Sequence, residues 1–583
     1  MSGFVGICSS KLTATETVVT DAVQDTIYSA KTSWRGLANS AELLLARSFF
    51  PFLEPAVTKA QQGDITVWID GEVYNEAALN TPGQNLAFAN LLLRHYTTDT
   101  LQSLLPRVDG VYVAIIHDQQ KQQLQIITDR YGLRPFYIAH RNNHLMMAPE
   151  VKCFAHFPML PLQIRSDMVD VFMALEHFLN DHTWLEHVAL TAPASIYTYR
   201  WDTGKLTSSR YWSWSQIKRT SLSFNEAAEA LAESLHRANT SRGYGAYGVG
   251  VALSGGLDSR AILAAVKDQK PVTYTFGIEG SPDVTVARRV AKLAGVKHVY
   301  YDMNVPDWLP QRFSGIWKTD GMLNAYHMHY SHMMEEIPKI IDVNLSGFLG
   351  DAVIGGSYLG KKGKSFLSRR IDAGIASHYY GQYYTLCDPN DSFFDLDKVD
   401  PYLFYNRGRR MIGMGAEEAN KTVPQRLPFM DAQLMDLAYS MPDEYRAESK
   451  IYNQALLLRY PEFFKHIPDA NSGLPIQVTP SLRMRMQEKM NWAIYAVKYK
   501  LGIPTSYTDV YNWLKEPQTA REIQTMLDPR TALYAQYTKN NYVTLYLEPH
   551  LKGRRNYMKQ IMGAITLEVW LQQLINKKYR PER

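Results

Sequence analysis

The sequence predicts an α/β protein with a strand-rich front half and a back half in which strands alternate with helices. Three front-half runs have the β-branched and apolar residues of half-buried or buried strands: Asp64–Asp70, Gly110–His117 and Gln122–Thr128. From about residue 220 the alternation of strands and helices predicts a doubly wound parallel sheet. Past about residue 365 we expect a mainly helical extension, which ends in an amphipathic stretch at Ile565–Ile575.

The length of the chain indicates more than one domain. At 583 residues it is too long for one ordinary core. The segment Arg200–Arg219 is polar and aromatic without clear periodicity, so we expect the boundary there. The predicted domains are therefore residues 1–205 and 220–583.

Composition excludes several classes of protein. Lys and Arg total 62 against 57 Asp and Glu, a net charge of +5 that does not indicate a nucleic-acid or membrane surface. The three cysteines lie too far apart for a disulfide framework or a zinc cluster. The sequence shows no signal peptide and no apolar run long enough to span a bilayer. We expect a cytoplasmic protein that binds neither nucleic acid nor membrane.

The sequence predicts that a helix begins the back half, and it also predicts the residue at which that helix starts. Ser223 and Glu226 have the spacing of a capping box. The elements expected after that helix are Gly248–Leu253, 259–268, Val272–Phe276, 284–294 and His298–Asp302. In such a sheet, ligands bind beyond the carboxyl ends of the strands.

A glycine-rich loop, Ser254–Ser259 (SGGLDS), joins the first of these strands to its helix. Glycines let backbone amides approach a phosphate, and a helix N-terminus favours the anion. Ser254 and Ser259 add hydroxyl donors. Phosphate would repel Asp258 unless a cation lay between them, which indicates a Mg²⁺ ligand. The alternative is an ordinary strand-to-helix turn rich in Gly and Ser.

The loop resembles the SGGLDS loop of the asparagine-synthetase-like ATP pyrophosphatases, which grips departing pyrophosphate. Three further blocks resemble the family in order: Phe276-Gly277 with the helix after it, Ser346–Asp351 (SGFLGD) with Gly355-Gly356, and Leu427–Asp431 (LPFMD). The resemblance implies carboxylate activation as an acyl-adenylate, with ATP and Mg²⁺ as cofactors. It places Mg²⁺ on Asp258 and Asp351. The implied nucleotide contacts are Leu253, Ser254, Gly255, Gly256, Asp258, Ser259, Phe276, Ser346 and Gly347.

The front half resembles the glutaminase domain of the same enzymes, an N-terminal-nucleophile hydrolase fold with an αββα sandwich. The matching segments are Met1–Ile7, Asp70–Asn75, Asp129–Pro135 and Ala148–Lys152. The resemblance therefore implies that this fold is kept.

Glutaminase chemistry is not expected. Ser2 stands where the family has its cysteine nucleophile, and serine is the weaker nucleophile at neutral pH. Serine could still act after removal of Met1, so this change leaves the question open. Asp70 replaces the usual Asn, and the family's RGPD segment has no clear counterpart. Cys8 lies inside the chain and is expected to be a buried strand residue.

If no ammonia is made, another amine must capture the adenylate. Phe348 and Ala352 stand where amide-forming relatives carry Glu or Tyr and an acidic residue, which disfavours asparagine or β-lactam synthesis. A peptide α-amine needs less help, because its pKa near 7.7–8.0 leaves part of it neutral. We therefore favour a lasso-peptide cyclase that joins a peptide N-terminus to an Asp or Glu side chain. A leader peptidase is a possible partner, and Lys450 is the candidate catalytic cation.

Two alternatives stay open. One is an amidotransferase or small-molecule amide synthetase that acts on a small carboxylic acid. The other is a non-catalytic nucleotide-binding subunit, which the retention of Asp258 and Asp351 argues against.

Three histidines lie close together on an expected helix: His327, His329 and His332. We interpret them as structural or substrate-facing.

Overall fold

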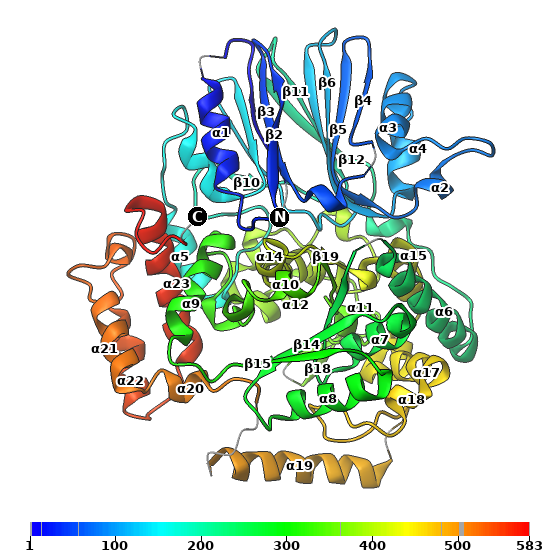
Figure 1. The fold of residues 1–583 in the computed structure, drawn as a ribbon, viewed down its shortest axis with the longest axis vertical. Coiled ribbons are helices and arrows are strands. Elements are labelled where there is room, and N and C mark those ends of the chain that lie inside the picture. The colour runs from blue at the N-terminus through cyan, green and yellow to red at the C-terminus, as the bar shows by residue number, and fades with distance from the viewer. Residues whose placement is uncertain are drawn as a thin grey trace.

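A computed structural model describes residues 3–581 apart from positions 13, 56, 246, 362, 480 and 501–505. Figure 1 shows a strand-rich front part stacked on a helix-rich back part. The predicted α/β class is confirmed, because the back part contains a parallel sheet flanked by helices.

Two six-stranded antiparallel sheets form the front part. Their strand orders are β10-β8-β9-β1-β3-β2 and β12-β11-β7-β6-β5-β4. The predicted front-half strands are confirmed as β5, β6 and β7. The strand bounds are β1 Gly3–Cys8, β2 Ser33–Asn39, β3 Leu43–Phe49, β4 Lys59–Gln62, β5 Ile65–Val73, β6 Gly110–Asp118, β7 Gln123–Thr128, β8 Tyr137–Arg141, β9 His144–Ala148, β10 Ala189–Leu190, β11 Ser195–Arg200 and β12 Lys205–Arg210.

The two sheets stack face to face around a buried apolar core. Phe4 and Met147 from one sheet and Trp68 and Ile115 from the other belong to this core. Helix α1 (Glu16–Gln24) packs on the outside of the first sheet, and α3 (Phe88–Thr97) packs on the outside of the second. The front part is therefore the expected αββα sandwich.

The back part is built on a five-stranded sheet whose strand pairs are all parallel. Its order is β15-β14-β13-β16-β19, so the chain moves outward in one direction, returns and continues in the other. The turning point lies between β13 and β16, which is where such sheets bind ligands. The bounds are β13 Val249–Ala252, β14 Val272–Gly277, β15 His298–Asp302, β16 Val343–Leu345 and β19 Gln425–Arg426.

The helices beside this sheet follow the sequence signals. Helix α6 (Phe224–Gly243) begins with the predicted capping box: the Ser223 hydroxyl accepts from the Glu226 amide, and Glu226 accepts from the Ser223 amide. Helices α7 (Leu257–Val266) and α8 (Pro282–Ala294) follow β13 and β14. The alternation predicted from the sequence is confirmed.

The helical extension is present, with two departures from expectation. The last long helix, α23 (Met558–Ile575), was expected to be amphipathic over 565–575, but it is buried on most sides, and even Glu568 is enclosed as an acceptor for two backbone amides. The histidine triplet does not lie on one helix, because the chain there forms two separate 3₁₀ turns. In the described part of the chain, no helix is both long and apolar enough to cross a membrane.

A buried ion network joins the front part to the back part. Glu150 of the front part accepts a hydrogen bond from Lys421 Nζ at 2.8 Å and is also paired with Lys152. Lys152 Nζ in turn donates to Asp320 of the back part at 2.9 Å. All four side chains are at most 3% exposed. Such a network fixes the two parts relative to each other.

Candidate functional site

The SGGLDS loop lies at the turning point of the parallel sheet. It follows the carboxyl end of β13, which pairs directly with β16, and it leads into the N-terminus of α7. The hydroxyls of Ser254 and Ser259 lie 3.0 Å apart, and the Gly256 amide donates to Ser254 Oγ at 3.2 Å. Two hydroxyls and a helix N-terminus thus converge at one point, an arrangement suited to an anion.

Gly255 is required by close packing. A Cβ atom at this position would lie 2.3 Å from the Cβ of Ala470, in a turn that arrives from the helical extension. Behind the loop, the buried Arg260 guanidinium donates to the carbonyl oxygens of Gly255 and Gly256 at 3.2 and 3.1 Å. Burial lowers the pKa of Arg260 to about 10, so it stays charged at neutral pH. The Arg260 guanidinium thus holds the Gly255 and Gly256 carbonyl oxygens on the inner side of the loop.

The two predicted metal ligands lie side by side. Asp351 is at the start of α11 (Gly350–Val353), and its amide donates to Asp258 Oδ2 at 3.0 Å. The other oxygen, Asp258 Oδ1, accepts from Tyr452 Oη at 2.8 Å. A Cβ on Gly350 would lie 2.5 Å from Asp258 Cγ, so a glycine is needed there for the two segments to meet. The Asp258 carboxylate is therefore fixed on both oxygens.

These groups face one cavity of about 490 Å³. Six of the predicted site residues line it: Ser254, Gly256, Asp258, Ser259, Gly347 and Asp351. The sequence reasoning missed the other lining residues, which are Ala252, Leu257, Ser449, Tyr452, Asp469 and Asn471.

The remaining predicted residues lie behind or beside this cavity. Leu253 is buried in the sheet, where its amide donates to Tyr274 O at 2.8 Å, and Gly255 packs on Ala470. The Ser346 amide bonds across to β19 at 2.9 Å. Phe276 lies in β14, with its ring 6.3 Å from that of Tyr507. Lys450 begins α17 (Lys450–Arg459) half-buried and is not among the lining residues, so its catalytic role stays a prediction.

Three carboxylates line the cavity: Asp258, Asp351 and Asp469. Enclosure by protein atoms raises the pKa of Asp258 to about 7, against the hydrogen bond from Tyr452, which lowers it. The charges of Asp351 and Asp469 raise it further. A divalent cation would relieve this repulsion, so the donor set fits Mg²⁺. Within the described residues no cluster of three or more acidic, His or Cys side chains could hold a metal, so a Mg²⁺ ion here would complete its coordination with phosphate and water oxygens.

Ala252 ends β13 and Leu257 lies in the SGGLDS loop, whereas the other four missed residues come from the helical extension. Asp469 starts a tight turn and accepts from the amides of Asn471 and Ser472 at 3.1 and 3.0 Å. Tyr452 reaches the site from the first turn of α17. The Asp-x-Asn-Ser-Gly turn at 469–473 was the only local signal for this segment, and it indicates a turn without placing that turn at the cavity.

In the glutaminase-like front half, Asp70, which stands where the family has Asn, forms a buried ion triad with Arg47 and Arg134. Asp70, only 1% exposed, accepts from Arg47 Nε at 2.8 Å and from Arg134 Nε at 2.5 Å. Burial opposes ionisation, but the two guanidinium groups prevail and hold the pKa of Asp70 below its usual value. Cys8 is buried in β1, as expected, and burial raises the pKa of its thiol. The prediction for Ser2 lies outside the described residues.

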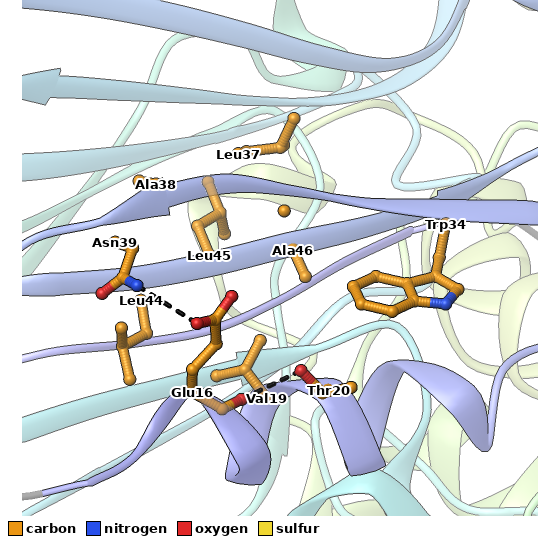
Figure 2. A pocket seen from close by; sticks show the side chains of 11 residues that line it. Glu16, Val19, Thr20, Trp34, Leu37, Ala38, Asn39, Leu44, Leu45 and Ala46 are labelled. Atoms are coloured by element: carbon orange, nitrogen blue, oxygen red, sulfur yellow. Dashed lines mark hydrogen bonds between the residues drawn. The ribbon is translucent and has the colours of Figure 1, made fainter.

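A groove of about 240 Å³ lies between α1 and the strands β2 and β3 (Figure 2). The Glu16 carboxylate points across it to Asn39 Nδ2, 3.2 Å away, and Trp34 lies at its far end. Glu16 is the one ionisable side chain among its lining residues. A single carboxylate offers no acid–base pair, so we assign no catalysis to this groove.

Comparisons with known proteins agree with this architecture. The family model of the glutamine amidotransferase domain matches residues 1–212, and that of asparagine synthase matches residues 230–391. The chain is 21% identical to asparagine synthetase [glutamine-hydrolyzing] 1 of Bacillus subtilis, over 89% of this chain and 87% of that protein. It is 26% identical to a probable asparagine synthetase of Acanthamoeba polyphaga mimivirus, over 39% of this chain and 42% of that protein.

A solved structure is also similar, at low overlap. It is the glutamine phosphoribosylpyrophosphate amidotransferase from B. subtilis complexed with ADP and GMP, with a TM-score of 0.24 and 12% identity over 52% of this chain and 65% of that chain. At this overlap the likeness carries no argument about function.

Proposed function

We propose that this chain, an ATP-dependent amide-forming ligase similar to the asparagine synthetases, closes a macrolactam in a peptide by joining the N-terminal amine to an Asp or Glu side chain. One observation carries the proposal. In the front half, both carboxylate oxygens of Asp70 already accept hydrogen bonds from Arg47 and Arg134. In the back half, Asp258 and Asp351 lie side by side at the cavity where we place the nucleotide. The attacking amine is then one that the substrate itself brings.

The proposed reaction has two steps. A carboxylate oxygen of the substrate attacks the α-phosphorus of ATP, and the bond to the β-phosphate oxygen breaks to release pyrophosphate. The amine nitrogen then attacks the carbonyl carbon, loses a proton and displaces AMP. The ring forms with the net loss of one water.

The residues of the cavity supply binding and charge control. Ser254, Ser259 and the start of α7 are placed to hold phosphate oxygens. Asp258 and Asp351 would hold Mg²⁺, which withdraws negative charge from the phosphates when bound. Tyr452 orients Asp258 through its hydrogen bond. ATP and Mg²⁺ are thus the proposed cofactors.

The residue type at position 348 supports the proposal that the attacking amine needs no general base from the protein. Phe348 is 6% exposed and lines a separate, buried pocket beside Arg409 and Arg410. It offers no proton donor or acceptor. A peptide α-amine is partly neutral near pH 7 to 8, and holding it close to the acyl carbon supplies much of the rate. A separate leader peptidase would expose that amine before cyclisation.

Exchange of labelled pyrophosphate into ATP tests the proposal. Short peptides with an Asp or Glu several residues from a free N-terminus should support exchange, yield AMP and give a product lighter by one water. Small acids should not. ADP as the nucleotide product would exclude adenylation. Turnover of a small carboxylic acid with ammonium, and none with any peptide, would instead support the amidotransferase or small-molecule synthetase, which the match of residues 1–212 to the glutamine amidotransferase domain favours.

A further inference from the structure

Helix α19 (Leu482–Lys500) presents a row of apolar side chains to solvent. Figure 1 shows it at the lower end of the molecule, set apart from the rest of the back part. The row, called here the α19 face, repeats every three to four residues and so lies on one side of the helix. It consists of Leu482, Met486, Met490, Ile494 and Val497, which are 77%, 65%, 50%, 44% and 57% exposed.

The same segment concentrates positive charge. Residues 482–500 contain five Lys and Arg against one Glu, whereas the whole chain has an excess of only five basic residues. Arg483 and Lys489 are exposed beside the apolar row. A partner that complements this face has apolar side chains together with acidic ones.

The helix is also tied to the rim of the nucleotide cavity. Asn491 Nδ2 donates to Ser472 O at 3.0 Å. The Ser472 amide donates to Asp469, and both Asp469 and Asn471 line the cavity. The helix itself therefore lies beside the rim of the cavity, with the α19 face turned to solvent.

We propose that the α19 face docks the substrate peptide, with apolar side chains on the row and acidic side chains against Arg483 and Lys489. This inference rests on the proposed function and deepens it. The helix is about 28 Å long, so it can contact roughly eight residues of an extended peptide. An amino acid or sugar acid is too short to use it. The two methionines on the row adapt to varied apolar partners.

Fluorescence anisotropy with the full chain tests the docking without ATP or turnover. The probes are three labelled 12-residue peptides that alternate Asp with Leu, Asp with Ser, and Lys with Leu. The Asp–Leu peptide should bind at least tenfold more tightly than the others. Met486→Gln with Met490→Gln keeps helix propensity and should weaken that binding at least tenfold, as should Arg483→Glu with Lys489→Glu. The matched control is Leu162→Gln, at an apolar residue 43% exposed in the front part, which should change nothing.

Equal binding of the three peptides, or undiminished binding by both double variants, overturns the docking face. So does preferential pelleting of the chain with phosphatidylglycerol vesicles, or a dimer in solution that the methionine double variant dissociates. Those two results assign the row to a membrane or to a second copy. Peptide binding without peptide-dependent pyrophosphate exchange keeps the docking face and refutes macrolactam closure, so the two proposals fail separately.

Discussion

The buried carboxylate of Glu150 predicts a large loss of stability when its charge is removed. Burial by itself disfavours the charged form, but Lys152 and Lys421 outweigh it and lower the pKa of Glu150 from 4.5 to about 2. That difference corresponds to about 3 kcal/mol of folding free energy at neutral pH. Because the folded-state pKa is the lower one, this contribution is complete above about pH 4.5 and is lost as the pH falls toward 2.

Glu150→Gln should therefore lower the free energy of unfolding by about 3 kcal/mol at pH 7, as measured by denaturation with urea. The deficit should be constant from pH 8 to pH 5. Part of it arises because the buried Lys421 keeps an unpaired charge, so Lys421→Met in the same chain should recover some stability. Asp397→Asn, at an exposed ion pair with Arg219, is the control and should cost less than about 1 kcal/mol. A deficit of under about 1 kcal/mol for Glu150→Gln would refute the reasoning.

Other substitutions test the nucleotide site by pyrophosphate exchange. Tyr452→Phe removes a hydrogen bond to the charged Asp258, worth about 1.5–3 kcal/mol. Half-maximal exchange should therefore need at least about tenfold more Mg²⁺. An unchanged requirement would show that Tyr452 does not position Asp258. Gly255→Ala places a methyl group 2.3 Å from the Cβ of Ala470 and should lower exchange at least tenfold. The control is Gly415→Ala, where no atom lies within 4 Å of the added methyl group, and it should not lower exchange. Equal effects of the two substitutions would refute the close packing of Gly255 on Ala470. Chelation of divalent cations should abolish exchange and added Mg²⁺ should restore it, and exchange that persists in the chelator would remove the metal from the account.

Local sequence chemistry was enough to predict the elements around the SGGLDS loop. The capping box of α6, the strand before the SGGLDS loop and the helix after it depend on neighbouring residues, and all are confirmed. Asp258 and Asp351 are 93 residues apart, and the family resemblance implied that they share a site. They meet because parallel strands bring their carboxyl ends to one edge. The functional roles of these residues, and the boundary near residues 205–220, stay predictions.

What the sequence did not reveal depends on contacts between distant segments. Tyr452 and Asp469 enter the cavity because the helical extension folds back onto the sheet, and no periodicity specifies that return. Lys450 lies two positions before Tyr452 on the same helix, yet Tyr452 lines the cavity and Lys450 does not. Helix α23 was misjudged as amphipathic because its polar residues Glu568 and Gln573 find buried partners.

The most direct test of the account is a crystal structure of the protein with Mg²⁺ and a non-hydrolysable ATP analogue. We predict the triphosphate against residues 254–259 and a metal ion at about 2.1 Å from carboxylate oxygens of Asp258 and Asp351. A triphosphate bound elsewhere, or a metal ion that touches neither carboxylate, would contradict the central claim.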